Sequence, residues 1–180
     1  SQGYVNNQIT DWSFKVDDIL HNVTQETVYD KVVKDITFKA LEGYNGTVLC
    51  YGQTGAGKTF TMTGATENYN QRGLIPRTIQ HLFKEIQSRP DASYSVRIGY
   101  LEIYNEQFYD LLSATALNSD SSSNLSIFDD RGDVFVKGLA YQLAANEEDA
   151  LNLLFEVSDL NYKDCFSFLI VQNFKSKVNI

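Results

Sequence analysis

Eight consecutive residues in the first third of the chain have the types and spacing needed to hold a phosphate chain. They read Gly52-Gln53-Thr54-Gly55-Ala56-Gly57-Lys58-Thr59 and fit the pattern G-x-x-x-x-G-K-[ST]. Glycines in this pattern allow a tight path along which backbone N–H groups surround a di- or triphosphate. The sequence therefore predicts a P-loop that binds nucleotide phosphates.

Two side chains of this loop should act on the ligand directly. We expect the ammonium group of Lys58 to reach the β- and γ-phosphates and the hydroxyl of Thr59 to bind Mg²⁺. A helix that follows the loop would direct its positive N-terminal end at the phosphates. The alternative is a glycine-rich turn with a solvated lysine, and the flanking sequence disfavours it. Residues 45–51 form a short apolar run typical of a buried strand, and a helix is predicted from Thr59 onward.

The rest of the chain alternates between predicted strands and helices, which is typical of an α/β layered fold. Alternating apolar residues predict strands at 12–16 and 94–104, and two short runs around a polar turn predict a hairpin over 125–136. One helix should begin after the N-cap Thr24 and end at Gly43, with an apolar face of Val28, Val32, Val33, Ile36, Ala40 and Leu41. A second helix should start near Pro76, with an inward face of Ile79, Leu82, Phe83 and Ile86. A third helix should follow the cap Asn146, with an inward face of Ala150, Leu151, Leu154 and Phe155. Residues 118–124, rich in serine, predict a mobile loop.

Composition and charge limit the function classes. The chain is 43% hydrophobic and carries 15 basic against 23 acidic residues, a net charge of −8. Acidity of this size disfavours nucleic acid as a partner, and no apolar run approaches the length of a membrane span. We expect a cytoplasmic or nuclear globular protein. Cys50 and Cys165 show no metal or disulfide spacing and are expected to be packing residues, and His21 and His81 receive no role.

Several blocks, in order along the chain, resemble the kinesin motor domain. They are GYNGT at 43–47, YGQTGAGKTFTMTG at 51–64, GLIPR at 73–77, and LEIYNE at 101–106 followed by DLL at 110–112. The resemblance runs from about Trp12 to Glu156 and is strongest to the kinesin-9 subfamily, through Ala56, the GATENY stretch and the EEDA stretch. It implies a P-loop NTPase with a central sheet flanked by helices, of which this chain would hold only the N-terminal part, incomplete at both ends.

The same resemblance implies a function and further site residues. A complete kinesin is a microtubule-stimulated ATPase, so the implied cofactors are ATP and Mg²⁺ and the implied partner is the microtubule, with a cytoskeletal location in the cytoplasm and, by the kinesin-9 likeness, in cilia or flagella. Phe60 stands where kinesins set a side chain beside the adenine, and the alternative is that its ring anchors the helix to the sheet. Lys137 lies in a stretch similar to the family's tubulin-contacting hairpin, and the alternative is a solvated lysine.

Turnover by this chain alone is doubtful from its sequence. Kinesins take the groups that sense the γ-phosphate from a serine-arginine-serine-histidine segment and an Asp-Leu-Ala-Gly segment, and neither occurs here. The resemblance stops after Glu156, so we divide the chain into a partial motor domain, 1–156, and a divergent tail, 157–180. The apolar run 165–171 of this tail is typical of an aggregation-prone β segment. Two readings remain open besides the motor: a truncated, non-catalytic nucleotide-binding or regulatory module, and an unrelated P-loop enzyme.

Overall fold

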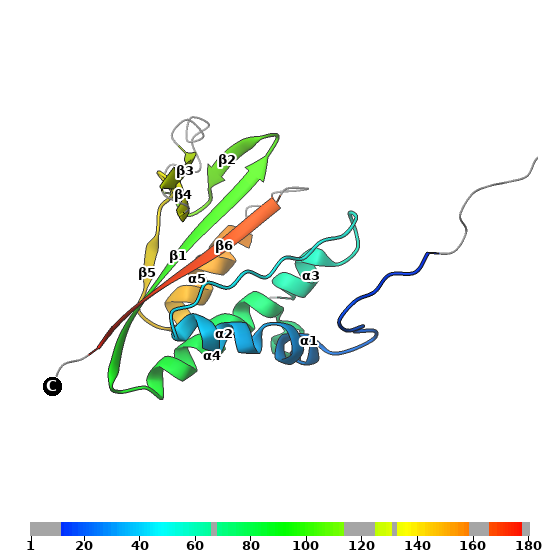
Figure 1. The fold of residues 1–180 in the computed structure, drawn as a ribbon, viewed down its shortest axis with the longest axis horizontal. Helices are drawn as coiled ribbons and strands as arrows, with labels where there is room; N and C mark the ends of the chain where they lie inside the picture. The colour runs from blue at the N-terminus through cyan, green and yellow to red at the C-terminus, as the bar shows by residue number, and fades with distance from the viewer. Residues whose placement is uncertain (1–11, 66–67, 114–124, 131–132, 159–165, 178–180) are drawn as a thin grey trace, which may run out of the picture.

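A long strand, β1 (Ala92–Tyr104), forms the centre of the molecule in the computed structural model. The structure describes residues 12–65, 68–113, 125–130, 133–158 and 166–177, with only the backbone described for 133, 157–158 and 166–177. Figure 1 shows the helices gathered to one side of this strand and a small hairpin beyond its opposite side. None of the helices in these ranges is long and apolar enough to span a bilayer.

Both edges of β1 are paired. Along one edge runs β6 (Phe166–Lys177), antiparallel, from the pair Ala92↔Lys177 to the pair Ile103↔Phe166. Since β6 takes that whole edge, the other edge must be shared by β2 (Gln107–Asp110) and β5 (Gln142–Ala144), both antiparallel. The turn from β1 to β2 has Asn105 and Glu106 at positive φ, as a two-residue hairpin requires. The strand predicted at 94–104 is confirmed.

The first predicted helix forms as two shorter ones. Thr24 caps α1 (Gln25–Val32) by accepting the backbone N–H of Thr27 at 3.2 Å, and α2 (Lys34–Leu41) follows directly. Val33, with φ −115°, separates them, although the Val33 N–H still bonds the Tyr29 carbonyl at 2.9 Å. The predicted apolar face is confirmed at Val33 and Leu41, whereas Val32 lies off the buried row Tyr29, Val33, Thr37 and Leu41 and is 43% exposed.

The other two long helices agree closely with the sequence pattern. Helix α4 (Leu74–Gln87) buries Ile79, Leu82 and Phe83, as predicted. Helix α5 (Glu147–Ser158) is capped reciprocally: Asn146 Oδ1 accepts the Asp149 N–H at 2.8 Å, and Asp149 Oδ2 accepts the Ala145 N–H at 3.1 Å. These two hydrogen bonds at the N-terminus of α5 fix the direction in which the helix leaves β5.

A single main core joins these helices to the sheet. Its members come from α2, α4, β1, the segment after β2, β5 and α5, and they are Leu41, Ile79, Leu82, Phe83, Val96, Ile98, Leu111, Leu112, Ala144, Ala150, Leu151 and Leu154. Val96 and Ile98 lie two residues apart and so point to the same face of β1. Helices α2, α4 and α5 therefore cover one face of the sheet, which gives the α/β fold that the sequence predicted.

The predicted hairpin is also present. It consists of β3 (Ser126–Asp130) and β4 (Asp133–Lys137), paired antiparallel from Ser126↔Lys137 to Asp130↔Asp133. The rings of Phe128 and Phe135 face each other with centroids 5.3 Å apart. The serine-rich stretch 118–124 lies outside the described residues.

Two predicted strands are wrong. Residues 12–16 and 45–51 have no strand assignment, and Trp12, Phe14, Leu49 and Tyr51 are between 72% and 89% exposed. Neither run pairs with a strand of the described sheet, in which both edges of β1 are taken by β2, β5 and β6. Cys50, placed in the second of these segments, is accordingly only half-buried.

The short helix after the P-loop, α3 (Lys58–Met62), meets the start of α4 backbone to backbone. Gly64, at φ +76°, forms a β-bridge with Arg72, and the Gly73 N–H donates to the Thr63 carbonyl at 2.9 Å. A Cβ atom at Gly73 would lie 2.5 Å from the Met62 carbonyl oxygen. The turn between them holds the short 3₁₀ helix η1 (Tyr69–Gln71). Glycine is required here because no side chain fits between the two segments.

We predict that Gly73→Ala lowers the free energy of unfolding by at least about 2 kcal/mol, because the new methyl group must push the end of α3 away from α4. Urea denaturation followed by circular dichroism measures the change. Gly43→Ala is the matched control: Gly43 has φ +101° and nothing within 4 Å of an added Cβ, so only backbone strain of about 1 kcal/mol is expected. Equal losses for the two variants would contradict the steric argument.

Candidate functional site

The P-loop adopts a path that only glycine takes easily. Gly55 and Gly57 have φ values of +80° and +89°, and an added Cβ at either position would meet nothing within 4 Å. Both are therefore needed for their left-handed backbone rather than for lack of space. Gly57 is the N-cap of α3, so the loop ends at the positive end of that helix.

Lys58 lies across its own loop. Its Nζ atom donates to the carbonyl oxygens of Gly52 at 2.8 Å and Gln53 at 2.9 Å. An ammonium group has three donors, so these two contacts leave one donor for a phosphate oxygen. The flexible side chain can turn toward that oxygen. Thr54, Gly55, Ala56 and Thr59 are exposed beside it. The loop thus offers backbone N–H groups, a cation and a hydroxyl on one open surface.

Phe60 follows this surface in the middle of α3. Its side chain is 52% exposed, so the ring is not a buried anchor between helix and sheet. Its carbonyl oxygen is held instead, by the Nε2 donor of Gln25 at 2.7 Å. Stacking of Phe60 on an adenine stays a prediction.

Gln25 is the residue of this site that sequence reasoning missed. It is 8% exposed although it is polar, and it stands in the first turn of α1 directly after the cap Thr24. The spacing contained a signal, because Gln25 and Tyr29 are four residues apart and therefore share one helix face. Both are buried. A polar residue on the apolar face of a helix must find a partner, and here the partner belongs to the P-loop helix.

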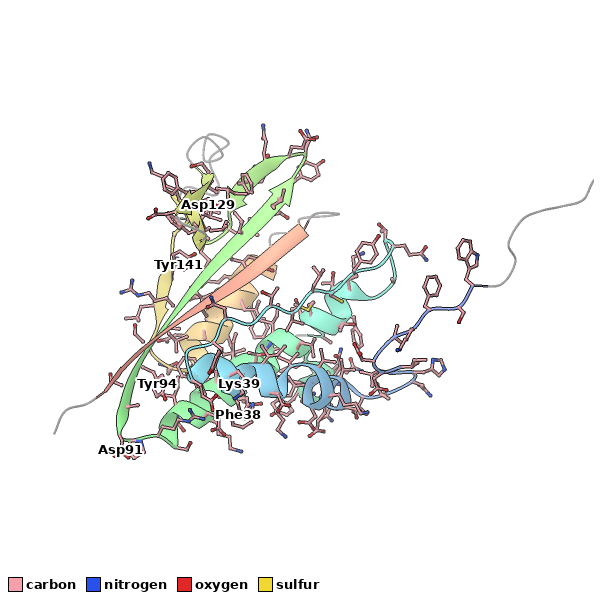
Figure 2. All side chains as sticks on the ribbon, in the orientation of Figure 1. Phe38, Lys39, Asp91, Tyr94, Asp129 and Tyr141 are labelled. Atoms are coloured by element: carbon pink, nitrogen blue, oxygen red, sulfur yellow. The ribbon has the colours of Figure 1, made fainter. Side chains whose placement is uncertain are left out.

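Behind Gln25, polar contacts join α1, α2 and α4. The Tyr29 hydroxyl lies 2.7 Å from His81 Nδ1 and 3.3 Å from Thr37 Oγ1, and burial raises the pKa of Tyr29. The His81 ring meets edge to face the ring of Phe38, labelled on α2 in Figure 2, with centroids 4.9 Å apart. These contacts fix the face of α1 that carries Gln25. His81, to which the sequence assigned no role, therefore has a structural partner in Tyr29.

Lys137 is far from this site. It is exposed at the end of β4, on the hairpin that Figure 1 places well away from α3. Four apolar side chains of the hairpin are also exposed by 46% to 67%: Ile127, Phe128, Val134 and Phe135. The hairpin thus exposes apolar side chains on both of its faces, Phe128 and Phe135 on one and Ile127 and Val134 on the other, with a cation at its base, separate from the P-loop.

A buried carboxylate holds the chain that leaves this hairpin. Asp110 is 6% exposed; its Oδ2 accepts the Ala140 N–H at 2.7 Å and its Oδ1 accepts the Leu112 N–H at 3.0 Å. The neighbouring Tyr141 ring, labelled in Figure 2, packs over Gly99 of β1, and its burial, with the charge of Asp110, raises the pKa of Tyr141. Asp110 therefore sets the position of the hairpin relative to the sheet.

Comparison with known proteins gives a consistent result. A family model described as the kinesin motor domain matches residues 2–161. Kinesin-like protein KIF9 of Mus musculus and that of Homo sapiens are each 54% identical over 155 residues, which is 86% of this chain and 20% of the relative. Kinesin-like protein KLP1 of Chlamydomonas reinhardtii is 47% identical over the same share of both chains.

The fold comparison agrees. A solved structure described as a fast kinesin, with implications for ATPase mechanism and interactions with microtubules, has a TM-score of 0.77 and 30% identity to this chain. The match covers 87% of this chain and 46% of that one. The chain thus spans about a fifth of the curated relatives and just under half of the solved structure.

We predict that Asp110→Ala lowers the free energy of unfolding by about 3 kcal/mol, because a buried and a part-buried backbone N–H group lose a charged acceptor. Urea denaturation measures it. Asp91→Ala, at the exposed turn between α4 and β1 seen in Figure 2, is the control and should change stability by less than about 0.5 kcal/mol. A loss at Asp110 no larger than that at Asp91 would show that the carboxylate does not hold the hairpin.

Proposed function

The chain belongs to the kinesin motor domain family, and from this premise we propose that it forms the ATP-binding part of a microtubule motor. ATP hydrolysis coupled to movement along microtubules is proposed for the complete motor, of whose relatives this chain spans about a fifth. The observation that carries the proposal is the geometry of the P-loop, with Gly55 and Gly57 in the left-handed region and Lys58 directly after them.

The residues present suit a magnesium nucleotide. The backbone of residues 52–59 would surround the phosphates, Lys58 would contact the β- and γ-phosphates, and the hydroxyl of Thr59 would bind Mg²⁺. Bound Mg²⁺ neutralises phosphate charge in this class of site. The open space beside Gly55 and Gly57 is consistent with close approach of a phosphate chain. Phe60, half exposed at the next turn, is proposed to lie beside the adenine.

The microtubule is the proposed partner, through the β3–β4 hairpin and Lys137. The whole chain is net −8, and the family's track is acidic, so long-range attraction cannot come from the total charge. Any attraction has to come from a local cation, and Lys137 beside an exposed apolar surface offers one. Nucleic acid is not a proposed partner. The proposed location is the cytoskeleton, and the likeness to kinesin-9 extends this to cilia or flagella.

Loss of the P-loop cation tests nucleotide binding. We predict that Lys58→Ala weakens Mg-ATP binding by about 50-fold or more, because a charge-assisted contact with phosphate is lost. Isothermal titration calorimetry of the 180-residue chain measures it. Lys84→Ala, which removes an exposed lysine on α4, is the control and should bind as the parent chain does. A parent chain with no measurable affinity for Mg-ATP would refute the proposal.

Charge reversal on the hairpin tests the microtubule contact. We predict that Lys137→Glu reduces co-sedimentation with microtubules about fivefold or more at low salt, and that the difference shrinks as salt is added. Lys15→Glu, an equal charge change at an exposed position of the N-terminal segment, is the control. If both variants lose binding equally, the effect comes from net charge, and the hairpin has no specific role.

A further inference from the structure

The carbonyl oxygen of Phe60 has no partner available within its own helix. In a longer helix this oxygen would accept the N–H of Gly64, four residues on. Gly64 is instead in the left-handed region, at φ +76°, and its N–H goes to the Thr59 carbonyl at 3.1 Å, which also accepts the Thr63 N–H at 2.8 Å. The turn at Gly64 thus leaves the Phe60 carbonyl to be satisfied from outside α3.

Gln25 satisfies it from a rigid position. Its Nε2 atom lies 2.7 Å from the Phe60 oxygen, and its side chain is almost fully buried. The first turn of α1 is fixed by the Thr24 cap, and the next residue on the same face, Tyr29, is bound to His81 of α4. A short hydrogen bond from a side chain that cannot move elsewhere constrains the backbone of its acceptor.

Resting on the proposed function, we propose that Gln25 is a positioning residue for the base side of the nucleotide site. It fixes the backbone of Phe60 and so fixes where the exposed Phe60 ring stands. The phosphate side depends on a different set of atoms, namely the loop backbone, Lys58 and Thr59, which precede Phe60. Among the described residues, the Gln25 side chain donates to the Phe60 carbonyl and not to the loop. Gln25 therefore contributes to affinity for the adenosine part of ATP and not to affinity for the triphosphate.

Inorganic tripolyphosphate separates the two halves of the ligand. The test compares Mg-ATP with Mg-tripolyphosphate by calorimetry on the parent chain and on Gln25→Met, which keeps the length of the side chain and removes its donor. We expect Gln25→Met to bind Mg-ATP about tenfold more weakly, the loss that one buried hydrogen bond produces, and to bind tripolyphosphate within about twofold of the parent. Phe60→Ala should show the same pattern, and adding Gln25→Met to it should cause little further loss, because both act through one ring.

Leu41→Ala serves as the structural control. It removes a fully buried side chain from the main core, to which no residue of α3 belongs, so it should lower the melting temperature at least as much as Gln25→Met does while leaving the ratio of the two affinities unchanged. The inference is overturned if Gln25→Met weakens the binding of both ligands equally or of neither. It is also overturned if Gln25→Met adds its full loss of Mg-ATP affinity to that of Phe60→Ala. In each case the proposed function stands. If the parent chain binds neither ligand, the proposed function is overturned and this inference with it.

Discussion

A helix of five residues is too short to keep its own direction in water, and α3, which carries Lys58 and Thr59, is such a helix. Its direction is therefore set by what it touches. At its end, Gly64 and Gly73 let the backbone of α3 lie against the start of α4, and on its side the Phe60 carbonyl is bound by Gln25 of α1. The contact at Gly64 and Gly73 sets where the cation and the hydroxyl of the P-loop point, and the bond from Gln25 sets the position of Phe60.

The neighbours of α3 are fixed in turn by the sheet. Helix α4 buries its apolar face against Val96 and Ile98 of β1, and α2 and α5 complete the same core. Polar contacts among Tyr29, Thr37 and His81 lock α1 to α2 and α4. On the other side of β1, Asp110 holds the chain that leads from the β3–β4 hairpin. The phosphate loop and the hairpin thus share one support, although they lie far apart.

Sequence periodicity predicted the helices and strands whose burial is decided locally. The faces of α4 and α5, the cap at Asn146, the strand β1 and the β3–β4 hairpin were all evident, as was the kinesin family, now supported by a family model over residues 2–161. Periodicity alone could not decide whether 12–16 and 45–51 form strands, because a strand exists only where another strand pairs with it. Gln25 was missed because its partner, the Phe60 carbonyl, becomes available only through the turn at Gly64.

The pairing of β6 with β1 shows that a segment outside the range of the family model can pair with an edge of the central strand. Residues 166–177 follow the range that the family model covers, yet they pair with β1 over its length. The ladder between antiparallel strands uses only backbone N–H and C=O groups, so it selects for β propensity and length rather than for a family sequence. The property that makes an apolar, proline-free segment prone to aggregate when it is free also makes it able to cover an open edge. Occupation of that edge by β6 completes the pairing of β1, and with it the support on which α4 and the P-loop helix depend.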